Sequence, residues 1–435
     1  MSRILIFGAG KSATYLIEYL SKACDENSWR LVVCDVNLKL AQSKISGSTN
    51  AVAVSIDVSN DDARKKLVQE ADIVISMLPP HLHFLVANDC LEYSKHLITA
   101  SYIDEKIKAL EEKIREKNLL FLCEMGLDPG IDHMSAMKII HRIKVSGGTI
   151  ISFKSHCGGL VAPENDDNPW HYKITWNPGN IVMAGSSGAI YRSNGDTVKV
   201  SYKEVFKNCT EVNIPGLFPL AWYPNRDSLA YINNYGLEDV DTFIRTTLRF
   251  PSFCRGWNKV VNMGLTELRD FDVIKECKTY REWFNKKLKT SLIKLKDNDE
   301  YREEFSRQIS YLDVNTDIPI KTSCNSSASL LQHLLETKLT IQPHEKDMIV
   351  MLHEIGYRLD GENKLIISSM VVKGDNQLHT AMAKTVGLPL GVAAKLIMEG
   401  KIKLRGLHIP IVAEIYEPVL AELENYLIKF TEQVI

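Results

Sequence analysis

The first 123 residues alternate six short apolar runs with stretches of helical character, and this alternation constrains the fold more than any other feature. The runs are "ILIF" (4–7), "RLVVCD" (30–35), "AVAVSI" (51–56), "DIVISM" (72–77), "HLITA" (96–100) and "LLFLC" (119–123). Strands that alternate with helices form a parallel sheet with helices on both faces. The sequence therefore predicts a doubly wound α/β domain.

The turn after the first run has the pattern of a dinucleotide-binding loop. It reads Gly8-Ala9-Gly10-Lys11-Ser12-Ala13, a G-x-G-x-x-A between a strand and a helix. The first glycine allows the tight turn, the second lets the backbone approach a pyrophosphate, and the alanine allows close helix packing. The helix amino terminus would face the phosphates. The motif and its context predict a Rossmann-type nucleotide site.

Acidic residues after the next runs bear on which dinucleotide binds. Asp35 ends the second run and is placed to accept hydrogen bonds from an adenosine ribose. A carboxylate there repels the 2′-phosphate of NADP, so NAD is favoured, with Lys39 left as a candidate phosphate partner. Asp57 is a candidate for the adenine edge or, equally, a helix cap. Leu78 and Pro79 are expected to line the nicotinamide pocket.

The remaining chain changes pattern after about residue 145. Longer β-like runs with a hairpin signal at Asn194-Gly195 predict a second sheet that is mixed or antiparallel. Residues 268–365 are lysine-rich with scattered apolar residues, "KDMIVMLHEIGYRL" among them, and are interpreted as helices. From 376, "NQLHTAMAKTVGLPLGVAAKLIMEG" predicts an internally packed helix.

Composition excludes several classes of protein. Of 435 residues, 45% are hydrophobic and 24% charged, as in ordinary globular proteins. Fifty-two basic and 54 acidic side chains leave a net charge of -2, which favours neither nucleic acid nor an anionic membrane. Nine cysteines without a CxxC pair argue against a disulfide framework and a metal site. With no signal or membrane segment evident, a cytoplasmic protein is expected.

Three stretches place polar residues where packing does not require them. They are "ASYID" with Ser101 and Tyr102, "GLDPGIDH" with Asp128 next to a predicted type II turn, and "SHCGGLVAPE", where Cys157 and two glycines interrupt a strand. The first two follow strands of the predicted parallel sheet, where ligands bind. The alternatives are a core aromatic for Tyr102, a turn former for Asp128 and a small buried residue for Cys157.

Two arginines are candidates for binding carboxylates. Arg226 in "WYPNRDS" and Arg249 in "RTTLRF" carry guanidinium groups that pair bidentately with carboxylates, although each taken singly is more typical of a solvated surface. His81 and His83 in "MLPPHLHF" are interpreted as loop residues. "HEIGY" lacks the second histidine of a zinc protease and "AGSSGA" is not a nucleophile elbow, so neither predicts a hydrolase.

Taken together, these stretches resemble the saccharopine reductases, the glutamate-forming saccharopine dehydrogenases of lysine metabolism. The likeness spans nearly the whole chain in order, and "GLDPGIDHM" and the Cys-Gly-Gly segment are its most specific parts. The matching segments are "IFGAGKSA", "SYID", "GLDPGIDHM", "CGGLVAPE" with "NPWHYKITWNPG", "YPNRDS", "TTLRF", "TAMAKTVGLPLGVAAKLI" and "IPIVAEIYEPVLAELE".

The resemblance implies an architecture and an activity. It implies a dinucleotide domain (1–132 with 400–435), an α/β substrate domain (133–267 with 366–399) and a helical insertion (268–365). Family members join glutamate to 2-aminoadipate 6-semialdehyde and reduce the imine to saccharopine, or run the reverse. The implied partners are these small molecules, with no nucleic acid or membrane, and a homodimer is the family's expectation.

The resemblance also assigns roles to residues. It places Leu127 beside the nicotinamide, and it implies Asp128, Tyr102 and Cys157 as candidates for proton transfer. It implies a substrate site made of Ser101, Tyr102, Asp128, Cys157, Arg226, Thr247 and Arg249.

One departure and three alternatives stay open. NADPH-using fungal members of the family tend to carry an arginine where this chain has Asp35, which again favours NAD. Lysine 6-dehydrogenase and carboxynorspermidine synthase share the scaffold with smaller or differently charged substrates. A non-catalytic NAD(H)-binding protein is the alternative from another class.

Overall fold

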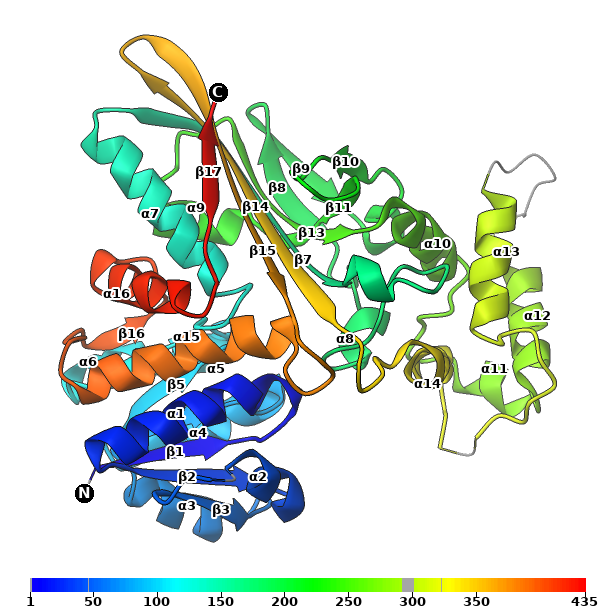
Figure 1. Cartoon of the computed structure of the whole chain (residues 1–435). Helices are drawn as coiled ribbons and strands as arrows, with labels where there is room; N and C mark the ends of the chain where they lie inside the picture. The colour runs from blue at the N-terminus through cyan, green and yellow to red at the C-terminus, as the bar shows by residue number, and fades with distance from the viewer. Residues whose placement is uncertain (1, 46, 292–300, 322) are drawn as a thin grey trace. The chain divides into compact units, whose positions relative to one another are not determined.

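The computed structural model describes residues 2–45, 47–291, 301–321 and 323–435. The chain forms two compact units, each with its own sheet and core (Figure 1). The first unit comprises Met1–Gly147 with Leu378–Phe430, and the second comprises Gly148–Gln377 with Thr431–Ile435.

The first unit is built on a seven-stranded sheet in which every strand pair is parallel. Its strand order is β16-β6-β5-β4-β1-β2-β3, which confirms the predicted doubly wound sheet. All six predicted strands are present, and β16 joins from far along the sequence. The strands are β1 (Arg3–Phe7), β2 (Arg30–Asp35), β3 (Ala51–Ser55), β4 (Ile73–Ser76), β5 (His96–Thr99), β6 (Leu120–Leu122) and β16 (Gly406–His408).

Helices cover both faces of this sheet because the strands are apolar on both sides. One face, with Phe7, Val74 and Phe121, packs against Val86 and Ile114 of the helices that follow β4 and β5. The helices are α1 (Thr14–Asn27), α2 (Leu38–Lys44), α3 (Asp61–Gln69), α4 (His83–Glu92), α5 (Glu105–Lys108), α6 (Glu111–Glu116), α7 (Ile131–Val145), α15 (Ala381–Met398) and α16 (Ala413–Glu424), with single 3-10 turns η1 (Lys11–Ala13) and η2 (Pro80–Leu82).

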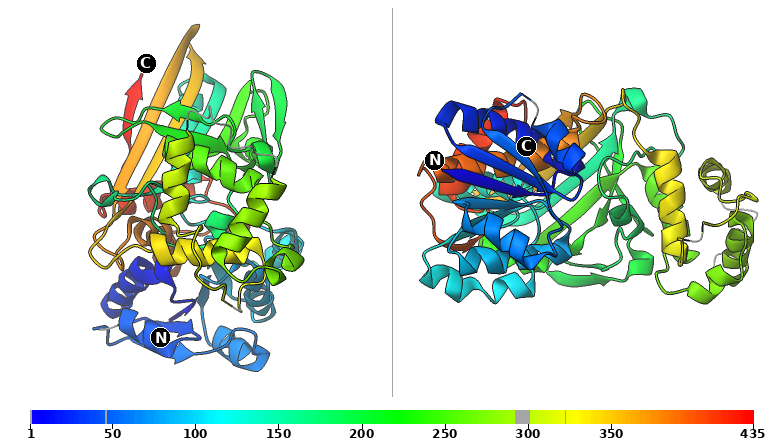
Figure 2. Two further views of the ribbon diagram at one scale, coloured as in Figure 1. Left: turned by 90° about the vertical axis from the view of Figure 1, so that its right-hand side faces the viewer. Right: turned by 90° about the horizontal axis from the view of Figure 1, so that it is seen from below.

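The long apolar helix α15 packs side by side with α1 on the other face (Figures 1 and 2). A Cβ placed on Gly387 would lie 3.0 Å from both Leu16 N and Ser12 O, so glycine permits the close approach. By length and composition α15 resembles a membrane span, but 78% of it is buried within the protein. It is therefore a core helix, as expected, but it belongs to the first unit and not to the substrate domain.

The second unit is built on a ten-stranded mixed sheet. Its main path is β10-β11-β13-β7-β14-β15-β17, with β7 and β13 parallel and the other pairs on that path antiparallel. The strands are β7 (Thr149–Val161), β8 (Ala189–Ser193), β9 (Asp196–Val200), β10 (Thr210–Val212), β11 (Leu220–Pro224), β12 (Arg226–Asp227), β13 (Thr242–Arg249), β14 (Asp347–Leu359), β15 (Glu362–Lys373) and β17 (Thr431–Val434).

Three expectations for this sheet have clear outcomes. The Asn194-Gly195 turn joins β8 and β9 as a hairpin, as predicted. The helical interpretation of 347–365 is wrong, because β14 and the start of β15 form a long hairpin here. The glycines after Cys157 do not interrupt a strand, since β7 continues to Val161.

The last strand, β17, comes from the carboxyl end of the chain. It lies at the sheet edge and pairs with β15, as Figure 1 and the left view of Figure 2 show in red beside orange. The predicted grouping of residues 400–435 with the dinucleotide domain is therefore wrong for this strand.

Helices of the second unit include the predicted helical insertion. Trp257, Trp283, Phe305 and Leu331 from four of them form a shared apolar core. The part of the insertion at 292–300 and 322 lies outside the described residues. The helices are α8 (Gly179–Val182), α9 (Ile232–Tyr235), α10 (Pro251–Asn262), α11 (Phe271–Lys275), α12 (Tyr280–Thr290), α13 (Arg302–Tyr311) and α14 (Ser327–Leu339), with 3-10 turns η3 (Pro163–Asn165), η4 (Tyr202–Glu204) and η5 (Leu229–Tyr231).

Candidate active site

The glycine-rich turn lies at the carboxyl end of β1, between β1 and β4, where the strand order of the first sheet reverses. Dinucleotides bind at such a switch point. Gly8 has φ of 100°, and a Cβ there would lie 2.8 Å from Met77 O. A Cβ on Gly10, in contrast, would meet no atom of the described residues within 4 Å. The space above Gly10 therefore fits a pyrophosphate, with Lys11, Ser12 and Ala13 in the following turn.

Asp35 is held at the end of β2 by two backbone groups. Its Oδ2 accepts a hydrogen bond from Ala9 N at 2.8 Å, and its Oδ1 accepts one from Asn37 N at 2.8 Å. The next residue, Val36, is 76% exposed and offers an apolar surface next to the carboxylate. This arrangement fits an adenosine, with the ribose at Asp35 and the base against Val36.

A buried lysine, Lys44, which was not predicted from the sequence, contacts the glycine-rich turn. Lys44 Nζ donates to Gly10 O at 2.5 Å, and its side chain is almost fully buried. Burial lowers the pKa of Lys44 to about 8, although the Asp35 and Glu18 carboxylates oppose this shift. The sequence of α2 does not predict this contact, because a lysine near the end of a helix is usually exposed to solvent.

The remaining cofactor candidates lie at the same edge of the sheet. Asp57 is exposed and accepts two hydrogen bonds from Ser59, which lower the pKa of its carboxyl. The cap of α3 is Asn60, so Asp57 does not cap that helix. Leu78 and Pro79 follow β4, the first half-buried and the second exposed.

Residues 124–133 place Asp128 next to Tyr102. The Tyr102 hydroxyl donates to Asp128 Oδ1 at 3.3 Å. Leu127 is buried just before the aspartate, and its carbonyl accepts from Asp132 N. Gly130 has φ of 147°, outside the range of the predicted type II turn.

Asp132 and His133 do more than begin α7. Asp132 Oδ1 accepts from Gly130 N at 2.6 Å, and His133 Nε2 lies 2.8 Å from Glu124 Oε2. The side chains of Glu124, Asp132 and His133 are all buried. They fix both ends of the segment that carries Asp128.

The third polar cluster lies on one face of the second sheet. Thr247 on β13 pairs in register with Cys157 on β7 and with Tyr223 on β11, so their side chains share a face. Arg249 lies two residues further along β13 on the same face. The structure therefore brings together three of the predicted residues. Arg226 is not among them: it is exposed in the short strand β12, which pairs with β8.

Arg249 carries a buried positive charge. Its side chain is buried, with the guanidinium centre 5.1 Å from the Tyr172 ring and 5.7 Å from the Phe253 ring. Its Nη1 donates to Leu248 O at 2.7 Å, but Nε has no hydrogen-bond partner within the described residues, and no described carboxylate pairs with the group. Burying an unpaired charge is costly, which points to an anionic ligand.

Tyr172 and Tyr223, which the sequence analysis did not single out, complete this cluster. Burial raises the pKa of Tyr223 to about 12, although Arg249 and Thr247 oppose the shift, so the phenol stays protonated and can donate. Tyr172 receives a hydrogen bond from Trp176 Nε1 at 3.3 Å. Both tyrosines lie in segments that carry the family resemblance, Tyr172 in "NPWHYKITWNPG" and Tyr223 in "YPNRDS", and these segments were the available signal.

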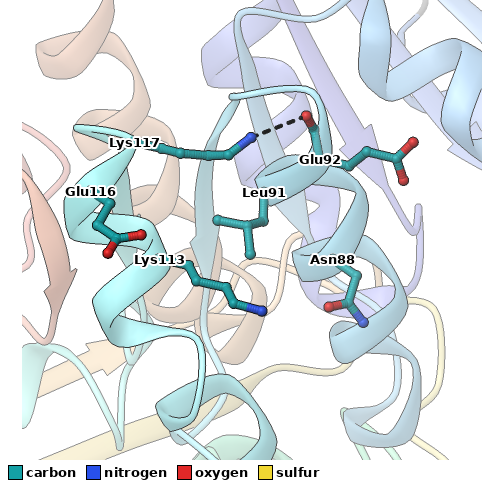
Figure 3. Close-up of a pocket in the computed structure, with 6 residues that line it drawn as sticks. All are labelled: Asn88, Leu91, Glu92, Lys113, Glu116 and Lys117. Carbon is teal, nitrogen blue, oxygen red and sulfur yellow. Dashed lines mark hydrogen bonds between the residues drawn. The ribbon is translucent and has the colours of Figure 1, made fainter.

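A pocket of about 520 Å³ lies away from these groups (Figure 3). It is found where α4 and α6 end, next to Lys117 Nζ, which donates to Glu92 O at 3.4 Å. Those helix ends lead into β5 and β6, so the pocket lies at the edge of the sheet opposite the glycine-rich turn. Its lining residues are Asn88, Leu91, Glu92, Lys113, Glu116 and Lys117.

Comparison with known proteins decides the family. A family model described as "Saccharopine dehydrogenase NADP binding domain" matches residues 4–122, and one described as "Saccharopine dehydrogenase C-terminal domain" matches residues 126–428. The chain belongs to the saccharopine dehydrogenase family. This confirms the resemblance inferred from the sequence.

Relatives from this family match along the whole chain. "Saccharopine dehydrogenase [NADP(+), L-glutamate-forming]" of Saccharomyces cerevisiae is 32% identical over 97% of this chain and 96% of its own. The apo structure of the Saccharomyces cerevisiae saccharopine dehydrogenase (L-Glu forming) has a TM-score of 0.90 at 30% identity and covers 100% of both chains. The predicted fold class is thereby confirmed.

Longer relatives match as well. "Alpha-aminoadipic semialdehyde synthase" of Arabidopsis thaliana is 33% identical over 99% of this chain and 45% of its own length, and the mitochondrial enzyme of Mus musculus is 36% identical over 99% and 48%. The chain thus spans about half the length of these relatives. The names of the family model and of the yeast enzyme specify NADP, so they do not support the expected preference for NAD. The cytoplasmic location stays a prediction.

Proposed function

We propose that this chain interconverts saccharopine with L-glutamate and 2-aminoadipate 6-semialdehyde, with NADP as the nicotinamide dinucleotide. The observation that carries the proposal is the buried guanidinium of Arg249, which lacks a carboxylate partner in the described part of the chain. Saccharopine has three carboxylates, and the glutamate-forming relatives match from end to end. The choice of NADP rests on the names of these relatives, which specify it.

The residues of the first unit fit the dinucleotide. When bound, the nicotinamide supplies or accepts the hydride. Gly10 leaves room for the pyrophosphate, Asp35 binds the adenosine ribose, and Leu78, Pro79 and Leu127 exclude water around the nicotinamide. Lys44 places a positive charge near Asp35 and so reduces the repulsion of a 2′-phosphate.

Asp128 is the proposed proton-transfer group. Forming or hydrolysing an imine requires protons to move at the substrate nitrogen and at a water oxygen. Asp128 accepts from Tyr102, which orients the carboxylate, and the pairs at Glu124 and Asp132 fix the surrounding segment. In this proposal Tyr102 positions the Asp128 carboxylate by donating a hydrogen bond to it. Cys157 lies beside Thr247 in the cluster that contains Arg249, and the proposal gives it no nucleophilic role.

Arg249 anchors a substrate carboxylate in the second unit. Its free Nε and the phenol hydroxyl of Tyr223 supply donors, Thr247 adds a hydroxyl on the same sheet face, and the Tyr172 ring lies beside the guanidinium. A planar guanidinium binds a carboxylate through two parallel hydrogen bonds. Fixing the substrate in this way can contribute roughly 7 to 11 kcal/mol to catalysis through orientation.

The test is a direct assay of the purified chain. Reduced-nicotinamide absorbance is followed with saccharopine and NADP, with NAD in parallel and lysine as the control substrate. We expect turnover with saccharopine and a higher kcat/KM for NADP than for NAD. Turnover with lysine alone would assign the chain to the sister activity, and dinucleotide binding without turnover would contradict an enzymatic role.

A further inference from the structure

A buried histidine connects two serines at the carboxyl edge of the first sheet. His83 begins α4 and is 3% exposed, so it is not the loop residue that the sequence suggested. Its Nδ1 lies 2.8 Å from the Ser76 hydroxyl at the end of β4, and its Nε2 lies 2.7 Å from the Ser101 hydroxyl after β5. The side chain therefore links the ends of two neighbouring strands.

The imidazole in this link is neutral. Burial lowers the pKa of His83 to about 4; His81 adds to this shift and Asp104 opposes it. A neutral imidazole has one N–H donor and one acceptor nitrogen. One serine must therefore donate to the ring, and the other must accept from it.

The surroundings of Ser76 decide which serine donates. Ser76 is 1% exposed, and within the described residues its hydroxyl oxygen contacts no hydrogen-bonding group other than His83. If Nδ1 carried the proton, the Ser76 hydroxyl hydrogen would be buried without an acceptor. A buried donor without a partner is rarer and costlier than a buried lone pair. Ser76 therefore donates to Nδ1, and the proton lies on Nε2.

We propose that His83 is a positioning residue that fixes Ser101 as a hydrogen-bond donor toward bound ligand. Nε2–H donates to Ser101 Oγ, so the serine hydrogen points away from the ring toward an acceptor oxygen. Thr99 Oγ1 accepts from Ser101 N at 3.2 Å, and Ser101 O accepts from Glu124 N at 3.1 Å, which hold the serine backbone. The acceptor is a carboxylate of the substrate or the carboxamide oxygen of the nicotinamide.

The tautomer is tested without any assay of activity. Histidine labelled with ring ¹⁵N is incorporated into the full chain, and long-range ¹H–¹⁵N spectra are recorded at neutral pH, with the His83 signals assigned by their loss in His83→Gln. We expect the neutral Nε2–H form. The Nδ1–H form or a charged ring would overturn the proposal, whether or not the chain turns over saccharopine.

The link to the ligand is tested by a double-mutant cycle, which rests on the proposed function. We expect Ser101→Ala and His83→Leu each to raise one KM by about tenfold, and the double variant to do no more, because the two residues form one unit. The KM that rises identifies the source of the acceptor, saccharopine or NADP. His83→Gln, whose amide can accept from Ser76 and donate to Ser101, should stay within about threefold of wild type.

The controls separate positioning from folding. His81→Leu changes an exposed neighbour and should leave both KM values unchanged. Circular dichroism confirms that each variant is folded. Additive effects of the two substitutions would contradict the proposal, and so would a folded His83→Gln variant that is as impaired as His83→Leu. A wild-type chain without turnover would contradict the proposed function instead, and the ¹⁵N spectra would then decide the tautomer alone.

Discussion

Single polar residues at or after the ends of strands make up the proposed binding site. Asp35 ends a strand of the first sheet, Ser101 and Asp128 follow strands of that sheet, and Arg249 ends a strand of the second. Their partners, however, come from other elements: Ala9 N holds Asp35, His83 holds Ser101 and Tyr102 contacts Asp128. The type of each residue thus sets the chemistry of its side chain, and its hydrogen-bond partner sets the orientation of that side chain.

Asp35 should set the balance between the two dinucleotides. We expect Asp35→Asn to raise kcat/KM for NADP by about tenfold, since removing a carboxylate near a phosphate gains on the order of 1.4 kcal/mol. The value for NAD should fall, because the ribose loses a charged acceptor. Initial rates with both dinucleotides measure the effect. Asp62→Asn, on the exposed first turn of α3, is the control, and an unchanged ratio for Asp35→Asn would remove Asp35 from the adenosine site.

Arg249→Met should separate binding from stability. The KM for saccharopine should rise about 100-fold, since a charge-assisted hydrogen bond contributes roughly 1.5 to 3 kcal/mol. The melting temperature should not fall, because methionine removes a buried charge without a described carboxylate partner. Steady-state kinetics and calorimetry test both statements. Arg192→Met, which removes a guanidinium bonded to two backbone carbonyls elsewhere in the unit, should leave KM unchanged.

His83 should give the chain an acid-sensitive stability. Its folded pKa is about 4 and its ordinary value is 6.5, so between these values the unfolded chain takes up a proton that the folded chain does not. The free energy of unfolding therefore falls as the pH drops from about 6.5 to about 4, by about 3 kcal/mol from this group. Urea titrations across this range should show a smaller fall for His83→Gln. Parallel curves for the two proteins would refute the assignment.

At the scale of elements, sequence periodicity predicted the strands and turns that depend on neighbouring residues. It did not predict features that depend on residues far apart in the sequence. The six strands of the first sheet and the 194–195 hairpin followed from apolar runs and turn residues. The helical interpretation of 347–359 fails because residues 348–352 of β14 are an unbroken apolar run buried on both sides, which hides the two-residue alternation of a strand. The Tyr223–Thr247–Cys157 row depends on the register of three strands, which no single stretch encodes.

The contact between α1 and α15 can be tested at its narrowest point. Gly387→Val places side-chain atoms against Leu16 N and Ser12 O, which are backbone atoms that cannot rotate away. We expect a loss of about 1 to 3 kcal/mol in the free energy of unfolding. Dinucleotide affinity should fall too, because Ser12 belongs to the turn that is proposed to bind the phosphates. Val386→Ala, one residue earlier on the half-buried side, is the control; equal costs for both variants would mean that the approach is not tight.

At the scale of the whole molecule, each unit has a core of its own and should respond to ligand separately. NADP at about 100 times its Kd should stabilise the unit that binds it by roughly 2.7 kcal/mol. Scanning calorimetry should show one transition moving and identify its unit. Gly10→Val should remove the shift without lowering stability, because a Cβ there meets no described atom while filling the pyrophosphate space. A shift that persists in this variant would place the dinucleotide elsewhere.

The first unit is assembled from two stretches of chain that are 230 residues apart in sequence. During synthesis, α1 emerges long before α15, and β6 long before its neighbour β16. The nascent nucleotide-binding sheet thus stays open on one face and at one edge while the ribosome translates the second unit. Such an intermediate exposes apolar surface and an unpaired strand, which are the features that chaperones recognise and that favour aggregation. Truncation near the carboxyl end would therefore harm the part of the protein made first.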